Sequence, residues 1–376
     1  MRGVRVHGAG PPLNIVILGL TITSSWGNGH ATTYRSLVRG LARRGHAVLF
    51  LERDKPWYRD TRDLPQPPYG LTRLYDGVAE LESLHAQALR QADLVIVGSF
   101  VPDGVAVCRL VQRLAQGATA FYDIDTPVTL AALADGRCDY LRPELIPGFD
   151  LYLSFTGGPI LRELEQRFRA RMARPLYCSA DPPAEASPAG GQAWDLGYLG
   201  TYSADRQPVL AALLCDPARA WPTGRFVVAG PQYPETLVWP DNCARIEHLP
   251  PDRHPGFYAG QRFTLNVTRA DMVRRGFSPS VRLFEAAACA TPVISDWWPG
   301  LDTLFRPGEE ILIARSGAEV LAMLRDLPEA ERLAIGQRAR ARVLAAHTGE
   351  HRAAELEGYA RAALAARSRP RRVARA

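Results

Sequence analysis

Short runs of consecutive apolar residues alternate with amphipathic helical stretches along the first half of the chain. Such runs, separated by helices, are typical of parallel strands in a sheet that helices cover on both faces. The stretch 31–45 has helical periodicity and ends at Gly45, a usual helix terminator. We therefore predict a doubly wound α/β domain whose strands fall at residues 14–23, 46–54, 93–100, 119–125 and 151–155.

A segment without apolar periodicity, CSADPPAEASPAGGQAW, interrupts this pattern at residues 178–194. Its Pro, Gly, Ala and Ser content is typical of a linker between domains. Beyond it we expect strands at residues 196–200, 225–230, 245–249, 263–267, 291–296 and 309–314, and helices at 207–214, around Glu285, and at 318–326, 328–345 and 349–366. The sequence thus predicts an N-terminal domain (1–177), a linker (178–194) and a C-terminal domain (195–348). We expect both domains to be Rossmann-like and to face a central cleft, where ligands usually bind.

The net charge of +6 is concentrated at the end of the chain. The last sixteen residues hold six arginines and no acid, so the rest of the chain nets 6 − 6 = 0. A neutral body argues against a nucleic-acid-binding protein, although a modified nucleic acid stays possible as a substrate. We expect residues 367–376 to form a disordered basic tail.

The six cysteines lie at least 28 residues apart, so no pair has the spacing of a metal site or a redox motif. Free thiols indicate a reducing compartment. The apolar stretch near the N-terminus is too short for a signal peptide, and no run approaches the ~20 apolar residues of a membrane span. With only one lysine among 45 basic residues, the composition indicates a GC-rich genome. We expect a cytoplasmic bacterial protein without integral membrane association.

The stretch SPSVRLFEAAACATPVISD, residues 278–296, reads as a helix followed by a buried strand. Ser278 and Ser280 flank a proline at the helix start, and the free amides of a first helical turn suit a diphosphate. Glu285 lies further along, among alanines that make the helix narrow enough for close approach of a ligand. Arg282 lies three residues before it, so an ordinary surface ion pair is the alternative interpretation.

Motifs along residues 13–360 resemble the CgeB-type glycosyltransferases, which have the GT-B fold. The resemblance rests on TSSWGNGHATTYR, YDIDTPVTL, LGYLGTYSADRQP, VVAGPQYP, TLNVTRADM, SPSVRLFEAAACATPVISDWWPGLD and EHRAAEL. It implies a nucleotide-diphosphate sugar as donor and leaves the acceptor undefined. It also implies that the helix at 349–366 packs back on the N-terminal domain. One position departs from the pattern of glycosyltransferase family 4: Phe277 stands where that family has a second Glu, so the retaining chemistry of that family is not implied.

The resemblance implies a donor site in the C-terminal domain. Glu285 would accept hydrogen bonds from the two ribose hydroxyls, for which an acceptor-only, bidentate carboxylate is suited. Arg282 and Arg206 would neutralise the diphosphate, and helix amides would stabilise the leaving group without a metal or other cofactor. The remaining donor-side residues would be Gly200, Tyr202, Ser278 and Ser280.

The N-terminal domain would hold the acceptor and the catalytic base. His30, in the loop WGNGH, resembles the base of inverting GT-B enzymes, and Asp125 would orient its imidazole, with Asp123 as the second candidate. His30 could instead cap its helix or contact phosphate. Asp123 and Asp125 have Asp-x-Asp spacing, but we expect no metal there. The other residues expected on the acceptor side are Trp26, Asn28 and Asp54.

Three other functions compete with glycosyl transfer. An epimerase of nucleotide sugars uses the same scaffold, but no additional acid–base pair supports it. Gly29 and Asp54 are 25 residues apart, near the spacing in dinucleotide-dependent oxidoreductases, yet the loop lacks the G-x-G-x-x-G pattern. A sugar-nucleotide-binding protein without activity is the third. The sequence favours the transferase.

Overall fold

The computed structural model describes residues 10–27, 29–183 and 192–368. Its contacts divide the chain into two compact units. Of the described residues, the first unit holds 10–24, 34–177 and 349–368, and the second holds 25–27, 29–33, 178–183 and 192–348. Asn28, residues 184–191 of the expected linker, and residues 369–376 of the expected tail lie outside the described residues.

A parallel sheet forms the centre of the first unit, with the strand order β3-β2-β1-β4-β5-β6-β7 among the described residues. In β1, five consecutive residues are buried, as a central strand covered on both faces requires. Val16 pairs with Leu49 on one side and Val95 on the other. The strands are β1 Asn14–Gly19, β2 Ala47–Arg53, β3 Leu71–Tyr75, β4 Leu94–Gly98, β5 Ala118–Asp123, β6 Leu151–Ser154 and β7 Ala173–Pro175.

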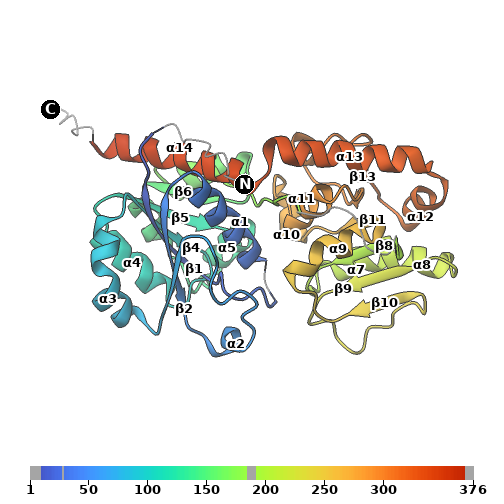
Figure 1. Ribbon diagram of the computed structural model, residues 1–376, viewed down its shortest axis with the longest axis horizontal. Coiled ribbons are helices and arrows are strands. Elements are labelled where there is room, and N and C mark those ends of the chain that lie inside the picture. Colours follow the sequence, from blue (N-terminus) through green and yellow to red (C-terminus); the bar gives the residue numbers. More distant parts are fainter. Residues whose placement is uncertain (1–9, 28, 184–191, 369–376) are drawn as a thin grey trace. The chain divides into compact units, whose positions relative to one another are not determined.

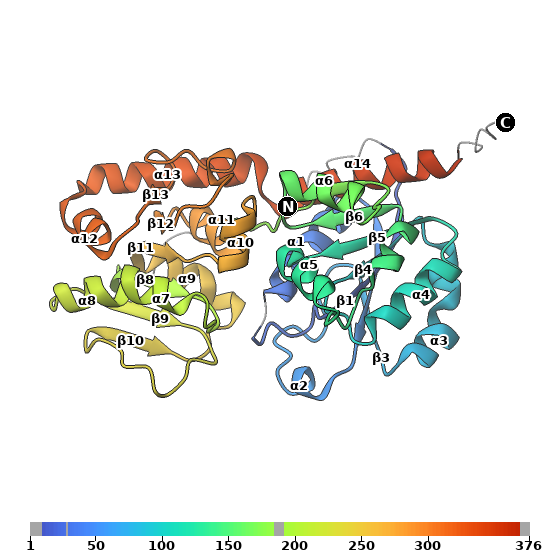
Figure 2. The ribbon, with the colours of Figure 1, turned by 180° about the vertical axis from the view of Figure 1, so that it is seen from behind.

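Helices cover both faces of this sheet (Figures 1 and 2). On one face α3 and α4 pack side by side against β1 and β4. The other face carries α1 and α14, which approach closely: a Cβ on Gly40 would lie 2.4 Å from the Gly349 carbonyl oxygen. The helices are α1 His30–Arg43, α2 Pro56–Arg59, α3 Val78–Gln91, α4 Gly104–Leu114, α5 Thr126–Ala134, a 3-10 turn Pro143–Gly148, α6 Pro159–Gln166 and α14 Gly349–Ser368.

The second unit has its own parallel sheet, in the order β10-β9-β8-β11-β12-β13. Its strands are β8 Trp194–Leu199, β9 Phe226–Ala229, β10 Cys243–Ile246, β11 Gln261–Asn266, β12 Val293–Ser295 and β13 Leu312–Ile313. Its helices are α7 Gln207–Leu210, a π-helical turn Ala211–Cys215, α8 Asp216–Ala220, α9 His254–Ala259 after a 3-10 turn Pro251–Arg253, α10 Ala270–Arg275, α11 Val281–Ala288, a 3-10 turn Leu301–Thr303, α12 Gly317–Asp326 and α13 Glu329–Ala346.

The predicted α/β class with two parallel sheets is confirmed, with differences in detail. The helix expected at 207–214 continues through the π-helical turn to Ala220. The sequence analysis did not identify β3 or β7, since their short, polar sequences lack a continuous apolar run.

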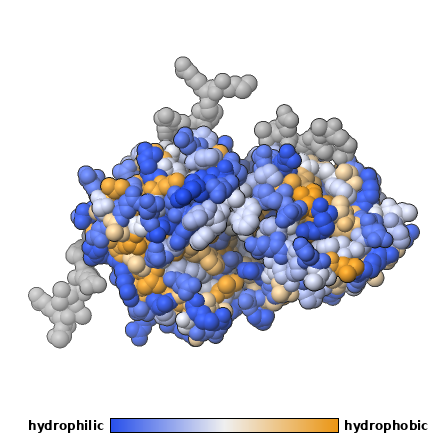
Figure 3. Space-filling view, turned by 90° about the horizontal axis from the view of Figure 1, so that it is seen from below, coloured by the Kyte–Doolittle hydropathy of each residue, from blue (hydrophilic) through white to orange (hydrophobic). Residues whose placement is uncertain are grey.

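Hydrophilic and hydrophobic residues are mixed on the face of the molecule that Figure 3 shows. On the face in Figure 3, hydrophobic residues form small groups among hydrophilic ones. None of the described helices is both long and apolar enough to cross a bilayer.

Candidate functional site

The helix α11 begins where the sequence analysis expected it, after Ser280. Ser280 has an extended backbone at the N-cap position, but its hydroxyl does not cap the helix. The hydroxyl donates instead to Oδ1 of Asn266, at the end of β11, over 2.7 Å. Ser278 is buried just before the helix. The N-terminus of α11 is therefore fixed to the carboxyl end of the central strand of this sheet.

Arg282 is buried and reaches the same edge of the sheet. Its Nε donates to the Leu199 carbonyl (2.5 Å) and its Nη1 to Asn266 Oδ1 (2.7 Å). The guanidinium carbon lies 4.5 Å from the ring centroid of Tyr198. Gly200 permits this approach, since a Cβ there would lie 2.7 Å from Arg282 Nη2. Arg282 turns away from Glu285, so the i, i+3 spacing does not produce the local ion pair that we considered.

Arg206 lies beside Arg282 at the start of α7. Its Nη2 donates to the Thr201 carbonyl over 2.6 Å, and its buried Nε has no hydrogen-bond partner among the described residues. Burial lowers the pKa of Arg206, and the positive charge of Arg282 acts in the same direction. Asp205 interacts electrostatically with Arg206, and Asp296 with Arg282. Within the described part of the chain, however, neither arginine donates a hydrogen bond to a carboxylate. One buried and one half-buried cation without a directly bound carboxylate make this edge of the sheet attractive to an anion.

Glu285 faces α9. The Tyr258 hydroxyl donates to its Oε2 over 3.1 Å, and Nδ1 of His254 lies 3.4 Å from the same oxygen. Among the described residues, no group donates a hydrogen bond to Oε1. The carboxylate thus has one oxygen held by the protein and one available to a ligand. The sequence analysis missed His254 and Tyr258, although their i, i+4 spacing would place them on one face of a helix.

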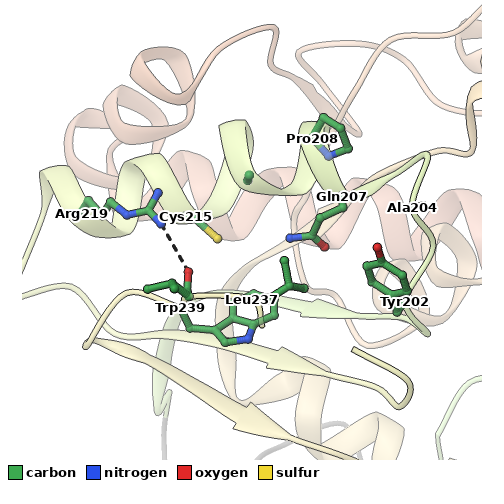
Figure 4. A pocket seen from close by; sticks show the side chains of 10 residues that line it. Tyr202, Ala204, Gln207, Pro208, Cys215, Arg219, Leu237 and Trp239 are labelled. Atoms are coloured by element: carbon green, nitrogen blue, oxygen red, sulfur yellow. Dashed lines mark hydrogen bonds between the residues drawn. The ribbon is translucent and has the colours of Figure 1, made fainter. Parts of the chain in front are cut away.

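Tyr202 lines a pocket of about 390 Å³ between α7–α8 and the loop 231–242 (Figure 4). The wall is mainly apolar, and an Arg219 hydrogen bond to the Val238 carbonyl (3.5 Å) crosses it. Arg206, Arg282 and Glu285 do not line this pocket. Its lining residues are Tyr202, Ala204, Gln207, Pro208, Ala211, Cys215, Arg219, Leu237, Val238 and Trp239.

Three acceptor-side candidates follow strands of the first sheet in the sequence: Trp26 and His30 come after β1, and Asp125 comes after β5. His30 is the first residue of α1 and is 8% exposed, while Trp26 in the preceding loop is 39% exposed. Residues 25–33 group by contact with the second unit, although we expected them in the N-terminal domain. Asp125 occupies the N-cap position of α5 and is partly exposed. The relation between His30 and Asp125 stays a prediction.

Asp123 does not line an accessible surface as expected, because it is fully buried below the end of β5. The Tyr152 hydroxyl donates to its Oδ2 (2.5 Å) and the Thr129 hydroxyl to its Oδ1 (2.7 Å). Burial raises the pKa of Asp123 to about 6 despite these donors. Its Oδ1 also accepts a hydrogen bond from the Asp125 amide (3.3 Å). Asp123 is therefore a structural support for the start of α5.

Asp54 is engaged by two arginines, Arg62 at 2.6 Å and Arg59 at 2.9 Å. The more informative acid is its neighbour Glu52, which is fully buried. Glu52 accepts hydrogen bonds from the amides of Ile22 (2.7 Å) and Thr23 (3.0 Å) and from the Thr23 hydroxyl (2.6 Å). It holds the loop after β1, which leads to Trp26 and His30. An acid at the end of an apolar strand was the sequence signal for it.

Within the described residues, no group of three or more His, Cys, Asp and Glu side chains could hold a metal ion. All six cysteines are buried free thiols.

Comparison with solved structures identifies the architecture. Sucrose-phosphate synthase from Thermosynechococcus elongatus superposes with a TM-score of 0.67 at 17% identity, over 94% of this chain and 99% of that one. HepE from Anabaena, in complex with UDP-glucose, gives 0.67 at 12% identity, over 93% of this chain and 100% of that one. The fold is GT-B.

Sequence comparison adds a functional class to this GT-B fold. Residues 206–358 match a family model described as Glycosyl transferase-like. An E. coli structure described as trehalose-6-phosphate bound with UDP-2-fluoro glucose also superposes, with a TM-score of 0.61 at 11% identity over 92% of this chain and 98% of that one. No curated protein is found to match the sequence. The family match and the fold together support a glycosyltransferase, and the matched region includes Arg206, Arg282 and Glu285.

Proposed function

We propose that this protein is a CgeB-type glycosyltransferase that moves a sugar from a nucleotide-diphosphate donor to an acceptor hydroxyl. The observation that carries the proposal is the pair formed by buried Arg282 and half-buried Arg206, neither of which donates a hydrogen bond to a carboxylate among the described residues. A diphosphate supplies anionic oxygens that such cations can bind directly. The neighbours bound to UDP-glucose and a UDP-sugar analogue support a sugar nucleotide as its source.

The donor site follows from these groups. The two arginines hold the diphosphate, and they stabilise the charge that develops on it as the sugar leaves, so no metal ion is needed. Glu285 accepts the ribose hydroxyls through Oε1, while Oε2 stays with Tyr258. Gly200 lets the diphosphate approach the strand end. The serines that precede α11 and Tyr202 complete the surroundings of the donor.

On the acceptor side, His30 removes the proton from the attacking hydroxyl, and Asp125 is the second catalytic residue that the resemblance implies. Trp26, Asn28 and Asp54 would face the acceptor, whose identity stays open. The six free thiols support a cytoplasmic location.

A thermal-shift panel tests the proposal. Purified protein is heated with nucleotide-diphosphate sugars, nucleoside diphosphates, nucleoside monophosphates, NAD and NADP. Ligand at 100 times its dissociation constant stabilises a protein by roughly 2.7 kcal/mol. We expect a shift with one sugar nucleotide and its diphosphate, and a smaller shift with the monophosphate.

Arg206→Met is the matched variant, with Arg338→Met, a half-exposed arginine of α13, as control. The diphosphate shift should fall in the first variant alone. Stabilisation by NAD or NADP only would overturn the proposal in favour of an oxidoreductase.

A further inference from the structure

Resting on this proposed function, we propose that His254 is a positioning residue whose protonation orients Glu285, so that nucleotide-sugar binding is coupled to pH. His254 does not belong to the motifs that carry the resemblance. It lies at the start of α9, next to Oε2 of Glu285. The proposed function assigns the other oxygen, Oε1, to the ribose hydroxyls.

The contacts of the imidazole define the proton that it must carry. Its Nε2 lies 3.2 Å from the Leu249 carbonyl oxygen, which can only accept, so Nε2 carries a hydrogen. In the neutral ring Nδ1 then presents a lone pair. That lone pair would face Oε2 of Glu285 over 3.4 Å. The contact becomes attractive only when Nδ1 is protonated as well and donates to the carboxylate.

Burial and charge act on His254 in opposite directions. Burial lowers the pKa of the imidazole, but the charge of Glu285 and a hydrogen bond to it, with a smaller contribution from Asp252, raise the pKa above its ordinary value. Tyr258 also faces Glu285; burial raises its pKa well above the usual value, so it stays a neutral donor. Burial likewise raises the pKa of the Cys289 thiol to about 12. Tyr258 and Cys289 therefore stay neutral, and His254 is the group beside Glu285 whose protonation can change.

The consequence for binding follows from the orientation of the carboxylate. Below the pKa of His254, Oε2 accepts from both His254 and Tyr258, which fixes Oε1 for the ribose hydroxyls. As the pH rises through that pKa, the imidazole becomes neutral and Glu285 keeps only the Tyr258 hydrogen bond. Because the pKa is raised in the folded protein, the stabilising pair exists at lower pH and is lost on the alkaline side. We expect donor affinity to fall about 3- to 30-fold between pH 6 and pH 8.5, the effect of one hydrogen bond.

Calorimetry of the intact protein tests this. The ligand is the sugar nucleotide that stabilises the protein most in the thermal-shift panel, because its diester phosphates do not titrate in this range. Binding above the pKa should take up a proton, which appears as a dependence of the enthalpy on the buffer. His254→Gln should bind with an affinity independent of pH and without proton uptake. His85→Gln, on α3 in the first unit, is the control and should behave as the unmodified protein.

The outcomes separate this inference from the proposed function. Binding that weakens at alkaline pH in the unmodified protein and not in His254→Gln supports both. Binding with the same pH profile in both proteins overturns the role of His254 alone. If no nucleotide in the panel binds, the proposed function and this inference both fall.

Discussion

Two buried carboxylates of the first unit show that the sequence position of an acidic residue does not predict whether its side chain is buried. Glu52 and Asp123 are both fully buried at strand ends. Each is compensated by local hydrogen-bond donors, as a buried charge requires. The sequence analysis selected Asp123 for its spacing and overlooked Glu52, because spacing does not show which way a side chain turns at the end of a strand.

Replacing Glu52 tests the link between this acid and the loop after β1. Glu52→Gln keeps the shape but turns an amide NH2 toward donors, so we expect a loss of about 1–3 kcal/mol in the free energy of unfolding. Chemical denaturation measures this loss. Glu82→Gln, on α3, is the matched control; Glu82 is half-exposed and forms only a surface ion pair with Arg113, so the free energy should change little. Equal values for both variants would show that Glu52 does not support the loop.

Asp123 should make stability depend on pH in the acid range. Its pKa of about 6 exceeds the value in an unfolded chain, so the folded state binds more protons between about pH 4 and pH 6. This group therefore costs stability as the pH rises through that window. The melting temperature of Asp123→Asn, relative to the unmodified protein, should be higher at pH 7.5 than at pH 4.5. Asp135→Asn, an exposed position, should show no such trend; the same result for Asp123→Asn would contradict the account.

At the scale of elements, long periodic segments were predictable and short ones were not. The helices α12, α13 and α14 begin and end within about two residues of the ranges expected from apolar periodicity. β3 and β7 are stabilised by pairing with their neighbours in the sheet, which no local pattern in the sequence records. In the same way, α11 was predictable as a helix, but the distinct partners of Arg282 and Glu285 were not.

The helix α14 should depend on one carboxylate for its packing in the first unit. Glu357 accepts hydrogen bonds from Arg44, the residue after α1 (2.6 Å), and from Arg361 (2.7 Å), and it lies 3.3 Å from His46 Nε2. Burial alone would raise its pKa, but the two arginines lower the pKa to about 2. Glu357→Ala should cost about 2–4 kcal/mol, since it removes the shared partner of two half-buried arginines. Glu350→Ala, in the first turn of the same helix, is the control.

The pH dependence of this contact has a definite sign. Because the pKa of Glu357 is depressed, its contribution is present above pH ~4.5 and is lost as the pH falls toward about 2. An acid titration followed by circular dichroism should show less loss of stability for Glu357→Gln than for the unmodified protein. Parallel titrations would refute this role.

At the scale of the whole molecule, each unit has its own parallel sheet, and this much followed from the alternation of strands and helices. The proposed donor residues come from distant parts of the chain, Arg206 from the loop before α7 and Glu285 from α11. In the sequence, only the resemblance to the CgeB-type glycosyltransferases assigned both residues to one site. No spacing to another residue identifies either of them as a donor-binding residue.

The acceptor side makes a separate prediction for turnover. If His30 is the base, His30→Ala should lower the turnover number about 10²- to 10⁴-fold with donor affinity little changed. Steady-state kinetics, with an acceptor first found by screening hydroxyl compounds, measures the turnover number, and calorimetry measures donor affinity. A collapse of donor affinity instead would identify His30 as a phosphate contact.

The central claim is that the C-terminal unit binds the ribose of a nucleotide-diphosphate sugar through Glu285. Isothermal titration calorimetry of Glu285→Ala tests this most directly, with Glu331→Ala, an exposed position on α13, as control. Loss of charge-assisted hydrogen bonds of about 1.5–3 kcal/mol predicts donor affinity lowered about 10- to 150-fold in the first variant and unchanged in the second. Donor affinity unchanged in Glu285→Ala would contradict the account.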